Sequence, residues 1–232
     1  MTPTVVFVRV VGKPEYEPVA KRWADSYRKH RPTIPHEVVM IERYADGDGS
    51  FADITTDVVR YDGGGWDCGA WQFAAASLGA RFLICFNSTT TIQGDGWLER
   101  FMDAVEAHGN GLYGPMASLE VAPHIRTPCM AFTPDVMIQY PHTVRTREET
   151  YQFESMGFGG TPNVSLFTRE RGLPVKMVTW SGVYDLLDCR KPANVFRSGD
   201  QSDLIVKDKH AEHYEQSDPS YRAYLEQLTR EK

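Results

Sequence analysis

The sequence predicts an α/β fold in which helices cover both faces of a mixed, mostly parallel sheet. Residues 4–11 and 82–86 are continuous apolar runs between turn signals, which is typical of strands buried on both faces. Val19, Trp23 and Tyr27 lie four residues apart and mark one face of an amphipathic helix between the first two strands. A β-α-β-β-α-β order in the first 90 residues favours parallel pairing.

Each expected element follows from its local pattern. β-Branched and apolar runs indicate strands, and apolar residues at helical spacing indicate helices. The expected strands are 4–11, 36–41, 58–61, 82–86, 112–115, 127–132 and 175–179, and the expected helices are 17–30, 67–78, 97–108, 145–153, 164–170 and 221–230. The chain from residue 185 to the last helix is polar and irregular. We expect a single domain over 1–232, with a nucleotide-binding half at 1–90 and an acceptor half with a C-terminal tail at 91–232.

Composition limits the class of protein. The 232 residues are 41% hydrophobic and 24% charged, as in an ordinary globular protein. A net charge of −6 argues against nucleic acid as a partner, because that partner requires a basic face. The four cysteines form no CxxC pair, so neither a disulfide framework nor a zinc site is indicated. No targeting segment or apolar run long enough to span a membrane is visible, so a cytoplasmic protein is expected.

The most informative stretch lies between residues 58 and 97. A glycine-rich turn at 63–65 leads into the 67–78 helix, and the apolar strand 82–86 ends in the polar triplet 87–89. Polar groups just beyond the carboxyl ends of parallel strands lie where open α/β sheets bind ligands. The sequence therefore predicts a nucleotide-type ligand here. Its candidate contacts are Asp62, Gly65, Trp66, Asp67, Asn87, Ser88 and Thr89. The plainer alternatives are a tight turn with Asp67 as a helix cap and a polar strand end.

The collinear order of these motifs resembles a GT-A-type glycosyltransferase. The resemblance rests on VVFVRV, GGGWDCGAWQ, LICFNSTTTI, GWLERF, PHIRTPCMAF, ETYQFES and FRSGDQSDLIVKD, and it covers most of the chain. It is closer to bacterial and phage glycosyltransferase-like proteins and more distant from the rhamnan-synthesis family. It implies a nucleotide-sugar donor (a UDP-, GDP- or dTDP-sugar), a glycan-type acceptor and a role such as polysaccharide biosynthesis. It leaves the oligomeric state open.

The sequence departs from that family at one motif. The Asp-x-Asp that holds a divalent metal on the donor diphosphate is replaced by Asn87-Ser88-Thr89, whose neutral oxygens are poor ligands for a hard cation. Mn²⁺ or Mg²⁺ would need other ligands, and His210 is a candidate because GT-A enzymes often supply a histidine near the carboxyl end. Without a metal, cationic groups must stabilise the leaving diphosphate. Arg9, His124, Arg126 and His210 are candidates for that role.

An inverting transferase needs a carboxylate that deprotonates the acceptor hydroxyl. Glu154 is the leading candidate because it stands alone between aromatic residues and just before a glycine-rich loop at 157–160. Asp200 is the second. The plainer explanations are an exposed charge at a helix end for Glu154 and a loop-ordering Asp for Asp200.

Three functions fit these observations. The first is transfer of a sugar from a nucleotide-sugar donor to a hydroxyl acceptor. The second is a non-catalytic protein of the same fold that binds a nucleotide or carbohydrate, which the missing Asp-x-Asp favours. A position of Glu154 beside Asn87 would favour the enzyme. The third is a nucleotidyltransferase, for which residues 9–13 (RVVGK) supply only a thin phosphate-binding motif.

Overall fold

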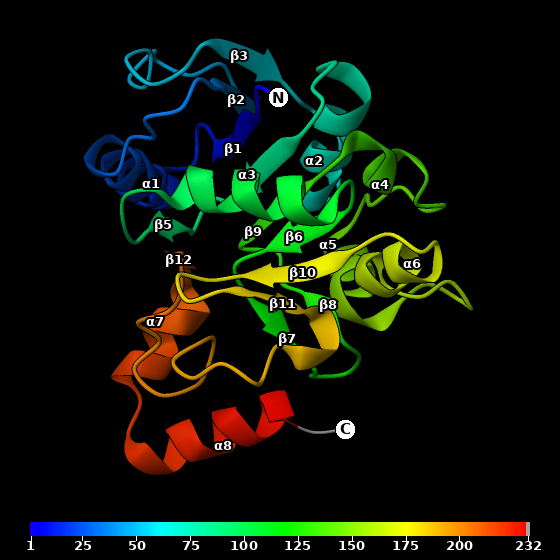
Figure 1. Ribbon diagram of the computed structural model, residues 1–232. Helices are drawn as coiled ribbons and strands as arrows, with labels where there is room; N and C mark the ends of the chain where they lie inside the picture. Colours follow the sequence, from blue (N-terminus) through cyan, green and yellow to red (C-terminus); the bar gives the residue numbers. More distant parts are fainter. Residues whose placement is uncertain (231–232) are drawn as a thin grey trace.

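The computed structural model describes residues 1–230, and its centre is an eight-stranded sheet (Figure 1). The strand order is β11-β10-β6-β9-β4-β1-β2-β3. The bounds are β1 Thr4–Val10, β2 Glu37–Arg43, β3 Asp57–Arg60, β4 Leu83–Phe86, β6 Leu112–Gly114, β9 Cys129–Phe132, β10 Val175–Val178 and β11 Val183–Asp185.

The sheet is mixed, as predicted. β1 pairs in parallel with β2 and β4, β2 with β3, and β6 with β10. β9 runs antiparallel between β4 and β6, and β11 is antiparallel to β10. The carboxyl ends of β1, β2, β3 and β4 therefore lie at one edge of the sheet, and β9 begins at that same edge. The expected α/β class with a mostly parallel sheet is confirmed.

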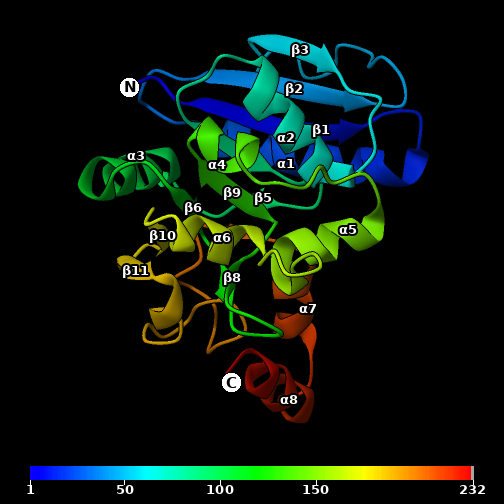
Figure 2. The ribbon, with the colours of Figure 1, turned by 90° about the vertical axis from the view of Figure 1, so that its right-hand side faces the viewer.

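Helices cover both faces of the sheet (Figure 2). α2, α4 and α6 pack against one another on one face, whereas α1 and α3 lie on the other. The bounds are α1 Glu17–Lys29, α2 Trp66–Ser77, α3 Trp97–His108, α4 Pro134–Ile138, α5 Arg147–Tyr151, α6 Val164–Glu170, α7 Lys209–Gln216 and α8 Pro219–Arg230, with short 3₁₀ turns η1 Pro14–Tyr16 and η3 Leu186–Asp188 and the π-helix η2 Gln152–Met156.

Aromatic packing joins the first helical layer to the sheet. Trp23 of α1 stacks on Phe7 of β1 with ring centroids 4.0 Å apart, and Trp97 of α3 meets Phe86 of β4 at 5.4 Å. All four side chains are completely buried. Burial of such rings stabilises the fold by roughly 1.5–3 kcal/mol each. This packing fixes the position of β4, whose carboxyl end carries the predicted ligand contacts.

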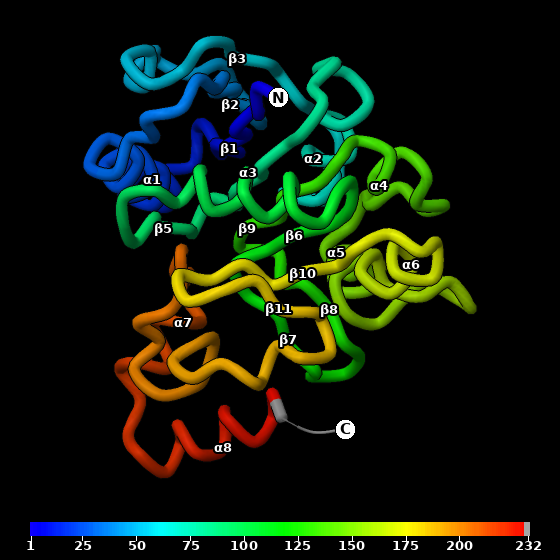
Figure 3. Tube along the Cα trace, viewed as in Figure 1, coloured from blue at the N-terminus to red at the C-terminus, as the bar shows by residue number. Residues whose placement is uncertain are grey.

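The C-terminal part contains regular structure that the sequence pattern did not reveal. β12 (Val206–Lys207) pairs antiparallel with β5 (Thr91–Ile92), and α7 follows it directly. The chain thus returns from residue 185 to the segment just after β4 before α8 extends beyond the sheet (Figure 3). A further small pair joins β7 (Ala117–Ser118) to β8 (His124–Ile125). Within the described residues, no helix has the length and apolarity needed to cross a membrane.

Candidate functional site

The polar triplet after β4 forms a tight turn. Asn87 Oδ1 accepts hydrogen bonds from Thr89 N at 2.9 Å, Thr89 Oγ1 at 3.1 Å and Thr90 Oγ1 at 2.7 Å. The backbone N–H of Asn87 donates to Pro128 O at 3.0 Å, and Thr90 Oγ1 lies 2.7 Å from the same carbonyl. The side-chain oxygen of Asn87 therefore serves the turn, which anchors the end of β4 to the start of β9.

The glycine-rich turn lets another loop pack against the start of α2. A Cβ on Gly64 would lie 2.1 Å from Arg145 O, and one on Gly65 would lie 2.0 Å from Val144 O. Gly65 has a φ of +79° and Trp66 a φ of +51°, in a region that costs an L-residue roughly 1–2 kcal/mol. Trp66 is nonetheless 39% exposed. Strained residues of this kind often occur at binding sites.

Asp67, in the first turn of α2, faces the turn after β4. Burial raises the pKa of Asp67 to about 6, although the positive charge of Arg43, the backbone amide of Ser88 and the charge of Lys209 all oppose that rise. These three groups come from the end of β2, the turn after β4 and the start of α7. A carboxylate that titrates close to neutrality at a ligand-binding edge is typical of a functional site.

Glu154 lies next to this turn. It belongs to the π-helix η2, a rare element that occurs frequently at functional sites. Its side chain is 12% exposed, and Oε1 accepts a hydrogen bond from Thr127 N at 2.9 Å. Thr127 is followed by Pro128, whose carbonyl accepts a hydrogen bond from Asn87 N. Glu154 and Asn87 therefore both contact the segment 127–128. The burial contradicts the alternative of an exposed charge at a helix end.

The start of α7 contributes a further carboxylate to this edge of the sheet. Asp208 is buried, and its Oδ1 caps α7 by accepting from His210 N at 3.1 Å and Ala211 N at 2.9 Å. Its Oδ2 lies 4.0 Å from Arg126 Nη2, and Arg126 Nε lies 3.9 Å from Glu154 Oε1. We define the strand-end cluster as Asp67, Asn87, Ser88, Arg126, Glu154 and Asp208.

Two histidines border the strand-end cluster. Burial lowers the pKa of His124, although the charge of Glu154 opposes this effect, and His124 Nδ1 lies 2.8 Å from Ala122 O. His210 is exposed, and partial desolvation together with the charge of Arg126 lowers its pKa. Both histidines are therefore predominantly neutral at pH 7 and add little positive charge.

Three other predicted site residues, Arg9, Asp62 and Asp200, lie outside the strand-end cluster. Arg9 is buried, with its guanidinium 3.0 Å from Glu17, 3.4 Å from Glu42 and 3.1 Å from Asp48. Asp62 is exposed and lies 2.7 Å from Arg60 Nε. The exposed Asp200 accepts from Ser202 N at 2.9 Å. Those partners give Arg9 and Asp200 roles in anchoring loops, and neither contacts the strand-end cluster.

Sequence reasoning missed Arg43, Asp208 and Lys209. Arg43 is buried at the end of β2, where it donates to Gly63 O at 3.1 Å. A basic residue at the carboxyl end of a predicted parallel strand was a usable signal. Asp208 and Lys209 gave no comparable signal, because their position depends on the pairing of β12 with β5.

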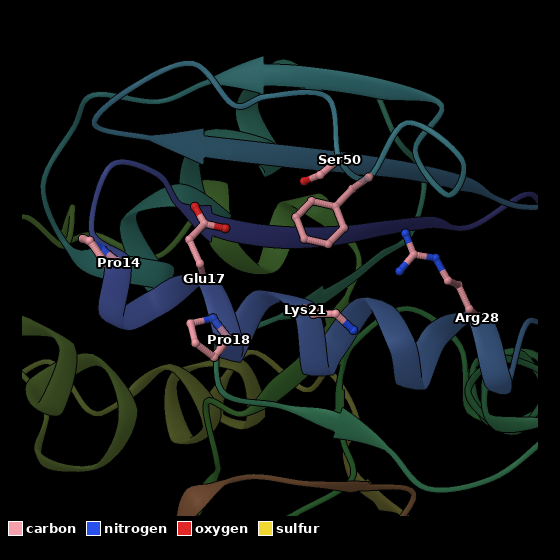
Figure 4. Close-up of a pocket in the computed structure, with 7 residues that line it drawn as sticks. Pro14, Glu17, Pro18, Lys21, Arg28 and Ser50 are labelled. Atoms are coloured by element: carbon pink, nitrogen blue, oxygen red, sulfur yellow. The ribbon is translucent and has the colours of Figure 1, made fainter.

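A sizeable cavity lies elsewhere on the molecule. Its volume is about 540 Å³, and it lies between α1 and the loop after β2 (Figure 4). Pro14, Pro18 and Phe51 supply apolar walls, while Lys21 and Arg28 lie along α1. Both cations are already paired with carboxylates, Lys21 with Asp25 and Arg28 with Asp53. This groove shares no residue with the strand-end cluster.

The residues at the end of β4 do not fit a divalent metal. Mn²⁺ and Mg²⁺ prefer several carboxylate oxygens, but the Asn87 oxygen is engaged in its turn and Asp208 caps a helix. In the part of the chain that the structure describes, no three His, Cys, Asp or Glu side chains gather into a possible metal site.

Comparisons with known proteins identify the fold. No family model matches the chain, and no curated protein matches it by sequence. Among solved structures, GalNAc-T7 with UDP, GalNAc and Mn²⁺ aligns with a TM-score of 0.53 and 10% identity, over 80% of this chain and 42% of that chain. The chain thus spans less than half of that protein.

Two other solved structures align less well. The mannosyltransferase PcManGT from Pyrobaculum calidifontis with GDP-Man and Mn²⁺ has a TM-score of 0.46 and 14% identity, over 60% of this chain and 46% of that chain. TarS from S. aureus also has a TM-score of 0.46 and 14% identity, over 65% of this chain and 32% of that chain. Similarity this weak does not by itself establish a shared fold. The alignment with GalNAc-T7 and the strand order together show an α/β fold of the GT-A type.

Proposed function

We propose that the protein is a glycosyltransferase that moves a sugar from a nucleotide-sugar donor to a hydroxyl group of a glycan or another acceptor. One observation carries this proposal: Glu154 and Asn87 flank the same segment at the carboxyl edge of the sheet. Glu154 bonds to Thr127 N at 2.9 Å, and Asn87 N bonds to Pro128 O at 3.0 Å. A carboxylate held beside the expected donor position is what a general base requires.

The energetic cost of this edge supports a binding role. Asp67 is desolvated despite its charge, Trp66 has a left-handed backbone, and the Arg126 guanidinium has carboxylates no nearer than 3.9 Å within residues 1–230. Each feature destabilises the fold, and natural proteins keep such features mainly where a ligand uses them. We propose that Asp67, Ser88 and Trp66 contact the donor nucleotide or its sugar, with Arg126 on the diphosphate.

In the proposed reaction, the acceptor hydroxyl oxygen attacks the anomeric carbon of the donor. The bond from that carbon to the diphosphate oxygen breaks, and the nucleoside diphosphate leaves with the bonding electrons. Glu154 accepts the hydroxyl proton. Glu154 Oε1 is oriented by Thr127 N, whereas Oε2 makes no hydrogen bond within residues 1–230 and is available for the proton. Positive side chains around the diphosphate stabilise its developing charge.

The test begins with donor turnover by the wild-type chain. A thermal-shift screen of UDP-, GDP-, dTDP- and CDP-sugars, with and without Mn²⁺, identifies the donor that stabilises the protein. Release of the nucleoside diphosphate is then measured with that donor as its sugar is transferred to water, which takes the place of the acceptor hydroxyl. We expect Glu154→Gln to lower turnover by a factor of about 10²–10⁴ while donor binding is retained.

Glu148→Gln is the matched control, because Glu148 is an exposed glutamate in the adjacent helix α5. It should leave turnover unchanged. If Glu154→Gln turned over the donor at the wild-type rate, Glu154 would not be the base. If a folded wild-type chain bound donors without turning any of them over, the non-catalytic alternative would replace the proposal.

A further inference from the structure

Arg126 carries a largely buried guanidinium that makes no hydrogen bond within residues 1–230. Its side chain is 12% exposed, and its contacts with Glu154 and Asp208 are 3.9 Å and 4.0 Å long, beyond hydrogen-bond distance. Nη1 is buried and has no partner within the described chain. A buried charge left without hydrogen bonds costs several kcal/mol, so this arrangement requires an explanation.

A second arginine lies behind Arg126. The guanidinium carbons of Arg126 and Arg197 lie 4.0 Å and 5.0 Å from the centre of the Phe196 ring. Burial and the charge of Arg126 both lower the pKa of Arg197, which shows that the two cations repel each other. Arg197 donates to Glu120 at 3.2 Å, but its buried Nε has no partner within residues 1–230. Phe196 thus holds two incompletely paired cations together.

The position of this pair coincides with the edge where the GT-A fold would place a metal. Arg126 precedes Thr127 and Pro128, and Pro128 O accepts from Asn87 N. The neutral turn at Asn87 does not fit a metal, whereas two arginines there fit an anion. A guanidinium matches the geometry of phosphate oxygens, and each N–H···O⁻ bond formed would satisfy a donor that is now unpaired.

We propose that Arg126, supported by Arg197, binds the diphosphate group of the ligand directly and makes donor binding independent of a divalent metal. This inference rests on the proposed function for the identity of the ligand, but the anion site can be tested without a nucleotide. Lys209 adds a third positive charge at the start of α7, where it acts on Asp67.

The experiment is isothermal titration of the full chain with inorganic pyrophosphate in the presence of EDTA. We expect binding in EDTA, a change of less than about twofold when Mn²⁺ replaces EDTA, and a loss of at least about tenfold in affinity for Arg126→Gln. Arg126→Lys keeps the charge and loses the two-pronged geometry, so it should weaken binding less than the Gln variant.

Arg171→Gln is the matched control. Arg171 also lies over a phenylalanine, with its guanidinium carbon 5.6 Å from the centre of the Phe167 ring and a carboxylate of Asp135 at 3.9 Å. Asp135 belongs to α4, which follows β9 at the opposite edge of the sheet. Pyrophosphate affinity should not change in this variant.

The outcomes separate this inference from the proposed function. Pyrophosphate binding that needs Mn²⁺, or that survives Arg126→Gln, overturns the inference even if the protein transfers sugar. Metal-independent binding through Arg126 upholds the anion site even if none of the nucleotide sugars is turned over. Should Arg126→Gln fail to fold, the wild-type titration in EDTA and the Arg126→Lys titration still decide between these outcomes.

Discussion

At the residue scale, Asp67 shows how this site opposes stability. Burial raises its pKa from an ordinary value of 3.8 to about 6. A carboxyl whose pKa is higher in the folded than in the unfolded state favours folding when it is protonated. Its effect on the free energy of unfolding therefore changes between pH 4 and pH 6, and above that range the charged form destabilises the protein by roughly 3 kcal/mol.

Asp67→Asn should therefore stabilise the protein at pH 7.5. The amide removes the desolvated charge, so the free energy of unfolding should rise by roughly 1–3 kcal/mol. The gain should disappear near pH 4, where wild-type Asp67 is already protonated. Urea denaturation at both pH values measures the difference. Asp62→Asn, at an exposed aspartate nearby, is the control and should change neither value. An equal gain for Asp67→Asn at both pH values would contradict the argument.

Residue identity at this site was partly predictable. Asp67 was predicted because it follows a glycine-rich turn, Ser88 because it follows an apolar strand, and Glu154 because it stands alone between aromatic residues. Arg9 was predicted as a cation that could stabilise the diphosphate without a metal, but Glu17, Glu42 and Asp48 surround its guanidinium. The sequence shows that a charged side chain is present. It does not show which opposite charges the fold brings within 4 Å of that side chain.

At the element scale, the N-terminus of α2 depends on a glycine at which any side chain would displace the neighbouring loop. Gly65 is the N-cap, with a φ of +79°, and a Cβ there would lie 2.0 Å from Val144 O. Gly79, just beyond the other end of α2, has a φ of +66°, but a Cβ added there would meet nothing within 4 Å. Both glycines therefore have a left-handed backbone, but only at Gly65 would an added Cβ clash with a neighbouring atom.

Comparison of Gly65→Ala with Gly79→Ala therefore isolates the steric term. Gly79→Ala should cost roughly 1–2 kcal/mol for the left-handed backbone. Gly65→Ala should cost about 1–3 kcal/mol more, because the 144–145 segment must move away from the turn. Chemical denaturation of both variants measures the difference. Equal costs would show that the packing of Val144 against the turn contributes nothing to stability.

The elements themselves were predicted unevenly. The helix at 97–108 was predicted with its observed bounds, because four apolar residues recur at helical spacing and three of them are buried. β12 and β5 have two residues each, which is too short for any periodicity to appear. α7 is polar over most of its length, and its clearest signal is the cap Asp208.

At the scale of the whole molecule, the candidate site exists because three distant segments meet at one edge of the sheet. Asp67 lies at the start of α2, and its carboxyl is acted on by Ser88 in the turn after β4 and by Lys209 at the start of α7. The meeting depends on the register in which Lys207 of β12 faces Thr91 of β5. Sequence predicted that the first two segments contact the same ligand, but it did not predict the third, since nothing local specifies a pairing across more than 100 residues.

Binding of a nucleoside diphosphate should therefore protect all three segments together. Hydrogen exchange measured by mass spectrometry should slow in peptides covering 65–68, 87–92 and 206–211 when the nucleotide identified by thermal shift is added. Ligand contacts stabilise the bound state against local opening, and the β5–β12 pair transmits that stability to α7. α4, at the opposite edge of the sheet, is the internal control and should exchange at an unchanged rate. Protection confined to the first 90 residues would mean that the 206–211 segment stabilises the fold but does not contribute to ligand binding.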